Sequence, residues 1–396
     1  MQITKKQRSL WIIIGITILN AIGMTIVMPI FPFLLEKYVA PENVAVAMSA
    51  LVSIFAASTF FAAPVFGALS DRYGRKSILL ISLFGSVVGY ILLGIGGALW
   101  ILFLGRIIDG LTAGNQSALF AYITDTTEPY ERGKWFGYIG GAIGLGFMIG
   151  PAIGGALGKV SVTLPFFLTA GITFVSMICI IVFLPESLPA EKRTKSLSLK
   201  NFNTFSHFNE IFSLKEARAL LIMGAFFYIG LNIWQFNASI FLKDVYKWGP
   251  LFIGEIFVLV GICDILSRVI ILPQLLKKFS EQTVGSIGLC GLATGLGLLF
   301  LSAYVQSVVI IIAAVGCIVL GEGLFDPSYN ARLSLSVDEN KQGVLQGTNQ
   351  SLQALYHVIV PLGAAAVYTY SHGAVFAIAA ALMLYGLILF MKLKTK

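Results

Sequence analysis

The sequence carries little charge for its length. Asp, Glu, Lys and Arg make up only 12% of the 396 residues, whereas a typical soluble protein has about 25%. Hydrophobic residues reach 57%, and the mean hydropathy is +0.87. So little polar surface excludes a water-soluble globule, a disordered chain and a charged coiled coil. An all-α membrane protein remains, because a helix satisfies its own backbone hydrogen bonds inside lipid.

Cysteine and catalytic motifs are scarce as well. The four cysteines lie in apolar segments and show neither a disulfide framework nor metal-ligand spacing, at Cys179, Cys263, Cys290 and Cys317. No Walker A string is present, because Gly158-Lys159-Val160 lacks both the upstream glycine and the following Ser or Thr. His-Glu-x-x-His and Gly-x-Ser-x-Gly are absent too. We therefore expect no enzyme activity, no metal site and no cofactor, with an ion gradient or the gradient of the substrate itself as the energy source.

Long uncharged segments predict where the chain crosses the membrane. A spanning helix needs about 20 apolar residues, and the uncharged stretches 9–35 and 43–70 exceed that length. Polar breaks at 302–307 and 369–373 divide two longer stretches into two spans each. The twelve predicted helices cover residues 9–35, 44–69, 77–96, 98–125, 134–158, 161–184, 218–242, 249–275, 282–301, 307–331, 343–367 and 374–391.

Lysine and arginine are distributed unevenly between the connections. Of the 27 such residues, four lie on odd-numbered connections, namely Lys37, Lys159, Lys243 and Lys247. Two more, Arg106 and Arg268, lie inside predicted spans, and all others lie at the termini or on even-numbered connections. This asymmetry predicts that the basic side, with both termini, faces the cytoplasm. Because membrane topology explains this distribution, it also argues against a nucleic-acid-binding patch.

The chain divides into two similar halves of six helices each. A polar, lysine-rich segment lies midway along the sequence, and at an offset of about 210 residues Asp109 falls on Glu322. We predict an N-terminal bundle at 1–185, a central cytoplasmic loop at 186–217 and a C-terminal bundle at 218–396. Two repeats around a central pathway are typical of transporters that work by alternating access.

The connection between the second and third predicted helices carries a dense motif. It reads Gly67-Ala-Leu-Ser-Asp71-Arg72-Tyr-Gly74-Arg75-Lys76 and resembles the signature loop of the major facilitator superfamily. Gly67 would let two helices approach closely, and Asp71 can pair with Arg75 one turn on. The resemblance implies a conformational latch between the halves made of Gly67, Asp71, Arg72, Arg75 and Asp125. The corresponding segment of the second half, 273–279, lacks the motif, so we expect no second latch.

The fifth predicted helix is rich in glycine. Gly146, Gly150 and Gly154 recur every four residues and form a bare ridge suited to close packing, while Pro151 would kink or weaken the helix. The string from Gly150 to Gly155 resembles the antiporter motif of the twelve-helix drug/proton antiporters. Nearly the whole chain is similar to the tetracycline-exporter-like members of that branch. The resemblance implies the twelve-helix fold of that superfamily and proton-coupled efflux.

The sequence departs from the tetracycline exporters at three membrane acids. Those proteins carry acids in helices 1, 3 and 9, where this chain has Asn20, Gly89 and Gly291. A metal–tetracycline substrate is therefore not expected, and other groups must carry the proton.

Charged residues inside predicted spans are costly and usually functional. Asp109 lies roughly 16 Å into the fourth helix, with Arg106 one turn away, and Glu322 is its counterpart in the tenth. Asp264 and Arg268 are spaced as an ion pair in the eighth helix. Burial disfavours the charged form of a carboxyl group, so we assign proton coupling to Asp109, Glu322 or Asp264, with the two arginines as buried cation partners. Permanent ion pairs are the structural alternative.

Polar residues at helical spacing suggest a cavity between the spans. The expected lining consists of Asn20, Gln116, Tyr228, Asn232, Gln235, Gln353 and His357. Polar stripes also join membrane helices to one another by hydrogen bonds, which is the alternative interpretation of these residues.

Together these patterns favour a secondary active transporter that exports amphipathic compounds in exchange for protons. The alternative is a dedicated exporter or importer of a specific metabolite, siderophore, sugar or lipid, which the missing acids support. The expected partners are a small-molecule substrate, protons and the lipid bilayer, with no nucleic acid. Short connections and the absence of an appended domain favour a monomer in the inner membrane of a bacterium.

Overall fold

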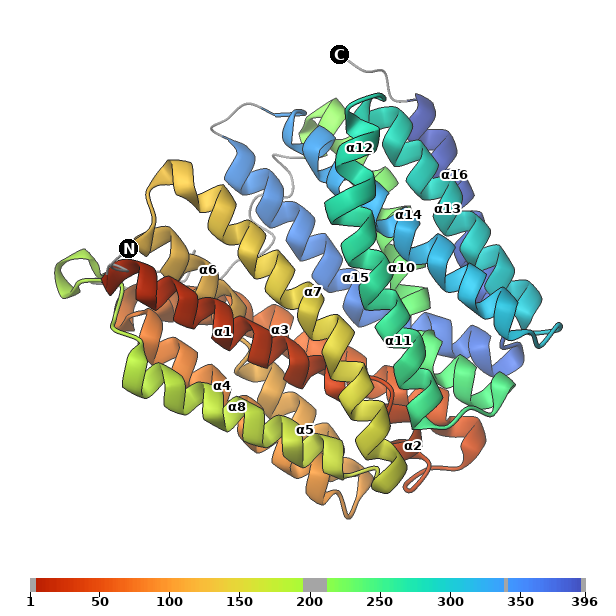
Figure 1. The fold of residues 1–396 in the computed structure, drawn as a ribbon, viewed down its shortest axis with the longest axis horizontal. Coiled ribbons are helices and arrows are strands. Elements are labelled where there is room, and N and C mark those ends of the chain that lie inside the picture. Colours follow the sequence, from red (N-terminus) through yellow and green to blue (C-terminus); the bar gives the residue numbers. More distant parts are fainter. Residues whose placement is uncertain (1–4, 195–211, 338–340, 393–396) are drawn as a thin grey trace. The chain divides into compact units, whose positions relative to one another are not determined.

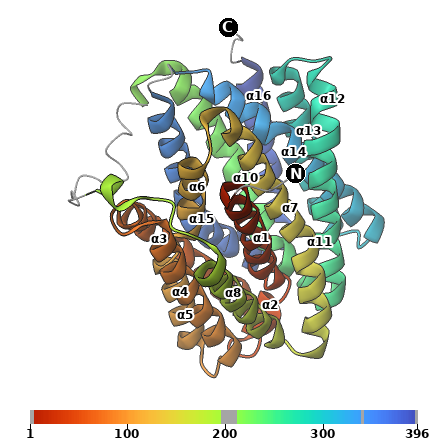
Figure 2. The same cartoon turned by 60° about the vertical axis from the view of Figure 1, so that its left-hand side comes forward.

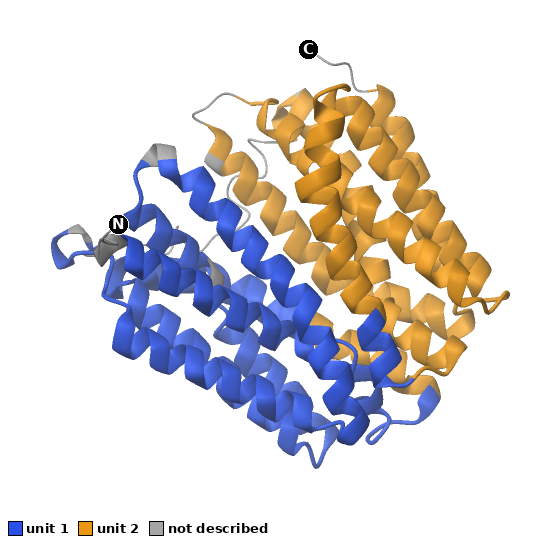
Figure 3. Cartoon of the chain, viewed as in Figure 1, with its two compact units in different colours: residues 1–41, 54–203, 249–255 blue, residues 42–53, 204–248, 256–396 orange. Residues whose placement is uncertain are grey.

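The computed structural model describes residues 5–194, 212–337 and 341–392, and these residues form helices and no β-strand. Figures 1 and 2 show the helices from two directions. The chain packs into two compact units (Figure 3). Unit 1 comprises residues 1–41, 54–203 and 249–255, and unit 2 comprises residues 42–53, 204–248 and 256–396. The predicted division at 186–217 stays a prediction.

The helices follow the predicted spans closely. The first half contains α1 (Lys5–Ile26), α2 (Phe31–Leu35), η1 (Pro41–Asn43), α3 (Val44–Tyr73), α4 (Arg75–Ile95), α5 (Leu99–Leu111), α6 (Asn115–Thr126), α7 (Pro129–Val160), α8 (Leu164–Phe183) and η2 (Ala190–Lys192). The second half contains α10 (Lys215–Tyr246), α11 (Pro250–Ile265), η4 (Leu266–Ile271), α12 (Leu272–Leu276), α13 (Glu281–Ser302), α14 (Val308–Ser334), α15 (Gln342–Tyr370) and α16 (Ala374–Lys392). Among the described residues, eleven helices are long and apolar enough to cross a membrane. The chain is therefore a multi-pass membrane protein.

Two predicted spans are broken. The predicted helix 9–35 divides into α1 and α2 at residues 27–30, where Pro29 has no N–H to continue the hydrogen-bond ladder. The predicted helix 98–125 divides into α5 and α6, and it is the span missing from the eleven. At that break the Thr112 hydroxyl donates back to the carbonyl of Ile108 at 2.8 Å, and the N–H of Gly114 donates to the Ser82 hydroxyl at 3.2 Å. These side-chain hydrogen bonds compete with the helical ladder.

The two halves repeat the same pattern of neighbouring helices. In the first half α1 packs against α7 and α8, and α4 packs against α5 and α8. In the second half α10 packs against α15 and α16, and α13 packs against α14 and α16. Each helix pair of the first half thus has a counterpart six spans later. This repetition is the structural counterpart of the weak self-similarity in the sequence.

Glycines bring the α4–α5 and α13–α14 pairs into backbone contact. A Cβ on Gly89 would lie 2.8 Å from the carbonyl oxygen of Gly105, and a Cβ on Gly105 would lie 2.8 Å from that of Gly89. In the second half, a Cβ on Gly288 would lie 2.7 Å from the carbonyl oxygen of Gly321. Any side chain at these positions would separate the helices. In lipid, where helices gain nothing from leaving water, such close van der Waals contact holds them together.

The glycines that follow Asp109 and Glu322 mark equivalent positions in the two halves. Gly110 packs against Ser58 of α3, and Gly323 packs against Ser267 of η4. Asp109 and Glu322, which precede these glycines, therefore occupy corresponding places in the two bundles. The alignment suggested by the sequence offset holds in three dimensions at this point.

Candidate functional site

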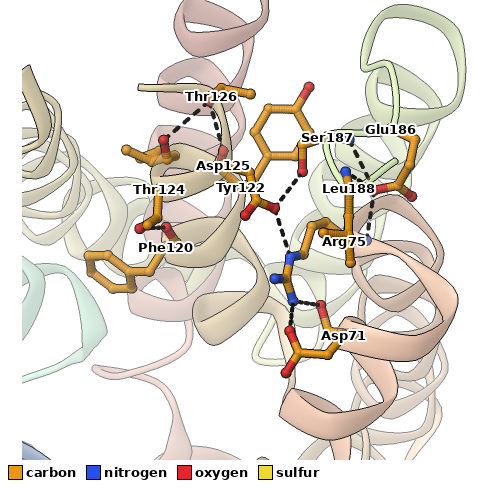
Figure 4. A network of polar contacts seen from close by, with 12 residues as sticks. Asp71, Arg75, Phe120, Tyr122, Thr124, Asp125, Thr126, Glu186, Ser187 and Leu188 are labelled. Carbon is orange, nitrogen blue, oxygen red and sulfur yellow. Dashed lines mark hydrogen bonds and ion pairs between the residues drawn. The ribbon is translucent and has the colours of Figure 1, made fainter. Parts of the chain in front are cut away.

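Arg75 is the centre of a polar network at the start of α4 (Figure 4). Its Nη1 lies 2.6 Å from Oδ1 of Asp71, and its Nε lies 2.9 Å from Oδ2 of Asp125. Nη1 also donates to the Ser70 hydroxyl at 3.1 Å. One guanidinium thereby joins the end of α3 to the end of α6. The planar fork of arginine suits this arrangement, which the single charged nitrogen of lysine could not reproduce.

Glu186 closes the same network from the segment that follows α8. Its Oε1 accepts the backbone N–H of Arg75 at 2.9 Å, and its Oε2 accepts that of Lys76 at 3.2 Å. The carboxylate caps the first turn of α4, where free N–H groups and the helix dipole favour negative charge. Gly74, at φ 98°, leaves the necessary room, because a Cβ there would meet this carboxyl group. Sequence reasoning missed Glu186, although an acid directly after a span was a usable signal.

Two of the predicted latch residues lie outside this network. Arg72 holds its guanidinium carbon 5.3 Å from the ring centre of Tyr73 and forms no ion pair with a described residue. A Cβ on Gly67 would meet no atom within 4 Å. Within unit 1 no described residue uses the room that Gly67 leaves, so the close helix approach at Gly67 stays a prediction.

The glycine ridge of α7 packs against α1. Added Cβ atoms on Gly146, Gly150 and Gly154 would meet Ala21, Thr25 and Ile26 of α1, respectively. The Thr25 hydroxyl also donates to the carbonyl of Gly146 at 2.8 Å. The helix continues through Pro151 to Val160, so the proline does not end it. Within its bundle the ridge is a contact surface between two helices, as its small residues require.

In the first bundle, Arg106 and Asp109 of α5 form a closed pair. Nη1 lies 3.3 Å from Oδ2, and the Ser86 hydroxyl of α4 donates to Oδ1 at 2.6 Å. Both residues are more than nine-tenths buried. The rings of Phe31 and Phe55 lie 4.8 and 4.7 Å from the guanidinium carbon, within cation–π range. The Arg106 Nε has no acceptor among the described residues, and the pair is neutral overall.

The second bundle gathers one cation and three carboxylates, which we call the Arg268 cluster. Arg268 of η4 lies 2.6 Å from Asp264, 3.5 Å from Asp326 and 3.8 Å from Glu322. The arginine side chain is 35% exposed, and those of the acids are 20 to 28% exposed. A single guanidinium cannot neutralise three carboxylates. The predicted pair of Asp264 and Arg268 is thus part of a larger group, to which the sequence reasoning did not assign Asp326.

Within the Arg268 cluster, Asp326 and Glu322 differ in the number of hydrogen-bond donors around them. Asp326 accepts from the Tyr228 hydroxyl at 3.2 Å, from Nδ2 of Asn330 at 3.0 Å and from Nη1 of Arg268 at 3.5 Å. Glu322 has only the 3.8 Å ion pair, which is too long for a hydrogen bond. No described residue donates a hydrogen bond to Glu322. Nor do described His, Cys, Asp and Glu side chains form a group of three that could hold a metal ion.

Arg268 lies in a π-helical turn, η4, between α11 and α12. The neighbouring Ser267 donates its hydroxyl to the carbonyl of Leu320 on α14 at 2.9 Å, which ties the turn to the helix that carries two of the acids. Single π turns within α-helices occur frequently at functional sites. The predicted helix 249–275 is therefore not uniform, and its irregular turn coincides with its arginine.

The predicted cavity residues of α10 have different surroundings. Tyr228 belongs to the Arg268 cluster through its hydroxyl, Asn232 is buried, and Gln235 is exposed. His357 of α15 packs edge-on against Phe236, with ring centres 5.7 Å apart. The helical spacing of the stripe is thus present, but of its three residues on α10 only Gln235 is exposed.

The other predicted lining residues are Asn20, Gln353 and Gln116. Asn20 of α1 and Gln353 of α15 are partly buried. The Nδ2 atom of Asn20 is buried and has no acceptor among the described residues. The side chain of Gln116 lies outside the part of the chain that the structure describes.

Comparisons with known proteins agree with this architecture. A family profile described as Major Facilitator Superfamily matches residues 13–361. The class H tetracycline resistance protein of Pasteurella multocida is 34% identical over 367 residues, which cover 92% of this chain and 90% of that protein. Multidrug resistance protein 2 of Bacillus subtilis is 28% identical and covers 90% of this chain and 88% of its own length. The solved structure of the nucleoside transporter NupG covers 99% of this chain and 100% of that one, with a TM-score of 0.79 at 14% identity, a likeness of fold alone.

Proposed function

The chain belongs to the Major Facilitator Superfamily, and we propose that it is a secondary active transporter that exports amphipathic drugs in exchange for protons by alternating access. Its relatives include a tetracycline resistance protein and a multidrug resistance protein, each matched over about nine-tenths of this chain. That breadth of similarity supports a drug-like substrate. We further propose that it works as a monomer in a bacterial inner membrane with both termini in the cytoplasm.

The charge balance of the second bundle is the observation that carries the proposal. Three carboxylates that share one guanidinium repel one another, and partial burial weakens the solvation that would offset the repulsion. Such a group favours the uptake of a proton. Because its side chains are partly exposed, the proton also has a route out of the site. A carrier needs both properties. The neutral pair of Arg106 and Asp109 has neither, so we favour a permanent ion pair there.

We propose that the Arg75 network acts as the latch that the family resemblance implies. Alternating access requires contacts that exist in one state of a transporter and break in the other. An arginine that bridges two acids from different helices is suited to that role, because loss of either acid leaves its charge uncompensated. Glu186 would add the start of the central loop to the same contact.

Proton release from everted membrane vesicles tests the proposed function. The vesicle interior is acidified by respiration and followed with a pH-sensitive dye, and tetracycline, ethidium or tetraphenylphosphonium is then added. We expect at least one of these compounds to release protons from vesicles that contain the protein. Vesicles from cells that lack the protein should show no release. Absence of release with all three compounds would contradict drug/proton antiport and favour a dedicated metabolite or lipid substrate.

A further inference from the structure

Two hydrogen-bond acceptors in the second bundle have no donor among the described residues. Glu322 meets Arg268 only at 3.8 Å. Asn232 is 2% exposed, and its Nδ2 donates to the carbonyl of Tyr228 at 2.6 Å, whereas its Oδ1 has no partner. A buried acceptor without a donor is costly. The buried Oδ1 of Asn232 and the carboxylate of Glu322, whose side chain is 20% exposed, can both accept from a donor that becomes available in another state of the protein.

The packing of α10 against α14 fixes their register. Three contacts define it: Gly224 with Tyr329, Phe227 with Phe325, and Tyr228 with Asp326. Residue numbers rise along α10 as they fall along α14, so the two helices run antiparallel. In this register, a position one turn later on α10 corresponds to a position one turn earlier on α14.

This register brings the two acceptors to the same level. Asn232 lies one turn after Tyr228, and Glu322 lies one turn before Asp326. A spacing of four residues keeps a side chain on the same face of a helix. Asn232 and Glu322 therefore occupy facing sides of neighbouring helices, one turn beyond the contact between Tyr228 and Asp326.

From this geometry we infer that Glu322 carries the exchanged proton and that Asn232 is its positioning residue. Protonation turns the carboxylate, which can only accept, into a carboxylic acid with one O–H donor. That O–H donates to Oδ1 of Asn232 and satisfies both groups together. When the proton leaves, the negative charge returns and Arg268 becomes its partner. The inference deepens the proposed function and rests on it, because it names the group that holds the exchanged proton.

The other ionisable groups around Glu322 are already engaged. Asp264 and Asp326 accept hydrogen bonds from Arg268. The Tyr228 hydroxyl donates to Asp326. On α13 no charged residue follows Glu281, and His357 of α15 packs against an aromatic ring. Glu322 is thus the one carboxyl of the cluster that accepts no hydrogen bond from a described residue.

An infrared pH titration of the purified protein tests the assignment without any substrate. A protonated buried carboxyl group gives a C=O stretching band separate from that of a carboxylate. We expect a band that titrates in the parent protein and disappears in Glu322→Gln. It should remain in Glu255→Gln, the same change at an exposed acid outside the cluster. Persistence of the band in Glu322→Gln would overturn the inference, whereas absence of drug-dependent proton release in vesicles would instead overturn the proposed function.

Variants of Asn232 test its positioning role. Asn232→Leu removes the acceptor and should move the midpoint of the band about one pH unit to the acidic side, a tenfold loss of proton affinity. Asn232→Asp adds a negative charge and should move the midpoint to the alkaline side. Asn237→Leu is the matched control, because Asn237 is 4% exposed and donates in the same way to Ile233 at 2.8 Å, but lies more than a turn further on. Equal midpoints in Asn232→Leu and Asn237→Leu would contradict the role of Asn232.

Discussion

The two bundles surround corresponding acids in opposite ways. Asp109 shares its helix with its cation, and Ser86 and two aromatic rings complete a buried, neutral site. Glu322 meets a cation from a neighbouring helix that two other acids also use. The packing of Gly110 on Ser58 and of Gly323 on Ser267 aligns these regions. The comparison shows that one position in a duplicated fold can hold a closed ion pair or one acid of a shared cluster, depending on which helix supplies the positive charge.

The largest expected effect concerns the neutral pair of the first bundle. Arg106→Met leaves Asp109 as a buried charge without a partner, which should cost about 3–5 kcal/mol of stability. The double variant Arg106→Met/Asp109→Asn removes both charges and should recover most of that loss. Thermal unfolding of the detergent-purified variants measures both changes.

Proton release by the single variant Asp109→Asn tests whether the site of Asp109 differs in role from that of Glu322. If the pair is structural, vesicles with Asp109→Asn should still release protons when a transported drug is added. Complete loss of release in well-folded Asp109→Asn would place a proton carrier in the first bundle and remove the contrast between the two sites.

A medium effect on stability is expected from changes in α7 and α15, which are corresponding helices of the two halves. Gly154→Ala drives a Cβ into the backbone of Ile26, which should cost about 1–3 kcal/mol. Gly363→Ala on α15 should be nearly neutral, because a Cβ there meets nothing within 4 Å. Unfolding midpoints of the two variants provide the test. Equal losses would show that α15 has a contact surface as close as the ridge of α7.

The sequence predicts most of the fold because long apolar runs and their breaks are local properties. It also predicts that Asp71 and Arg75 meet, since their spacing alone puts them on one helix face. It does not predict the division of α5 from α6, which depends on Ser82 from another helix. Neither does it predict contacts between distant segments, such as Glu186 at the start of α4. Nor does the sequence show whether the room at Gly67 is used, because a small residue permits a close approach without requiring one.

The smallest expected effect concerns the first turns of α4 and α13, which are corresponding helices. The carboxylate of Glu186 caps α4 from a distant segment, so Glu186→Gln should cost about 0.3–1 kcal/mol. Ser280 caps α13 locally through the N–H of Thr283 at 3.3 Å. Hydrogen exchange at the two helix starts measures the effects. Glu186→Gln should also loosen the segment 186–194, whereas Ser280→Ala should change only its own turn.

The backbone contacts between glycines in the α4–α5 and α13–α14 pairs have a consequence for the history of the chain. Glycines make the closest backbone contacts in both pairs, and where an acid takes part, as Asp109 does against Gly89, it does so through its Cα and Cβ and not through its carboxylate. After a gene duplication, selection could therefore alter the ionisable groups of one copy without changing its shape. The two halves of such a protein can therefore keep the same helix packing while their ionisable groups differ.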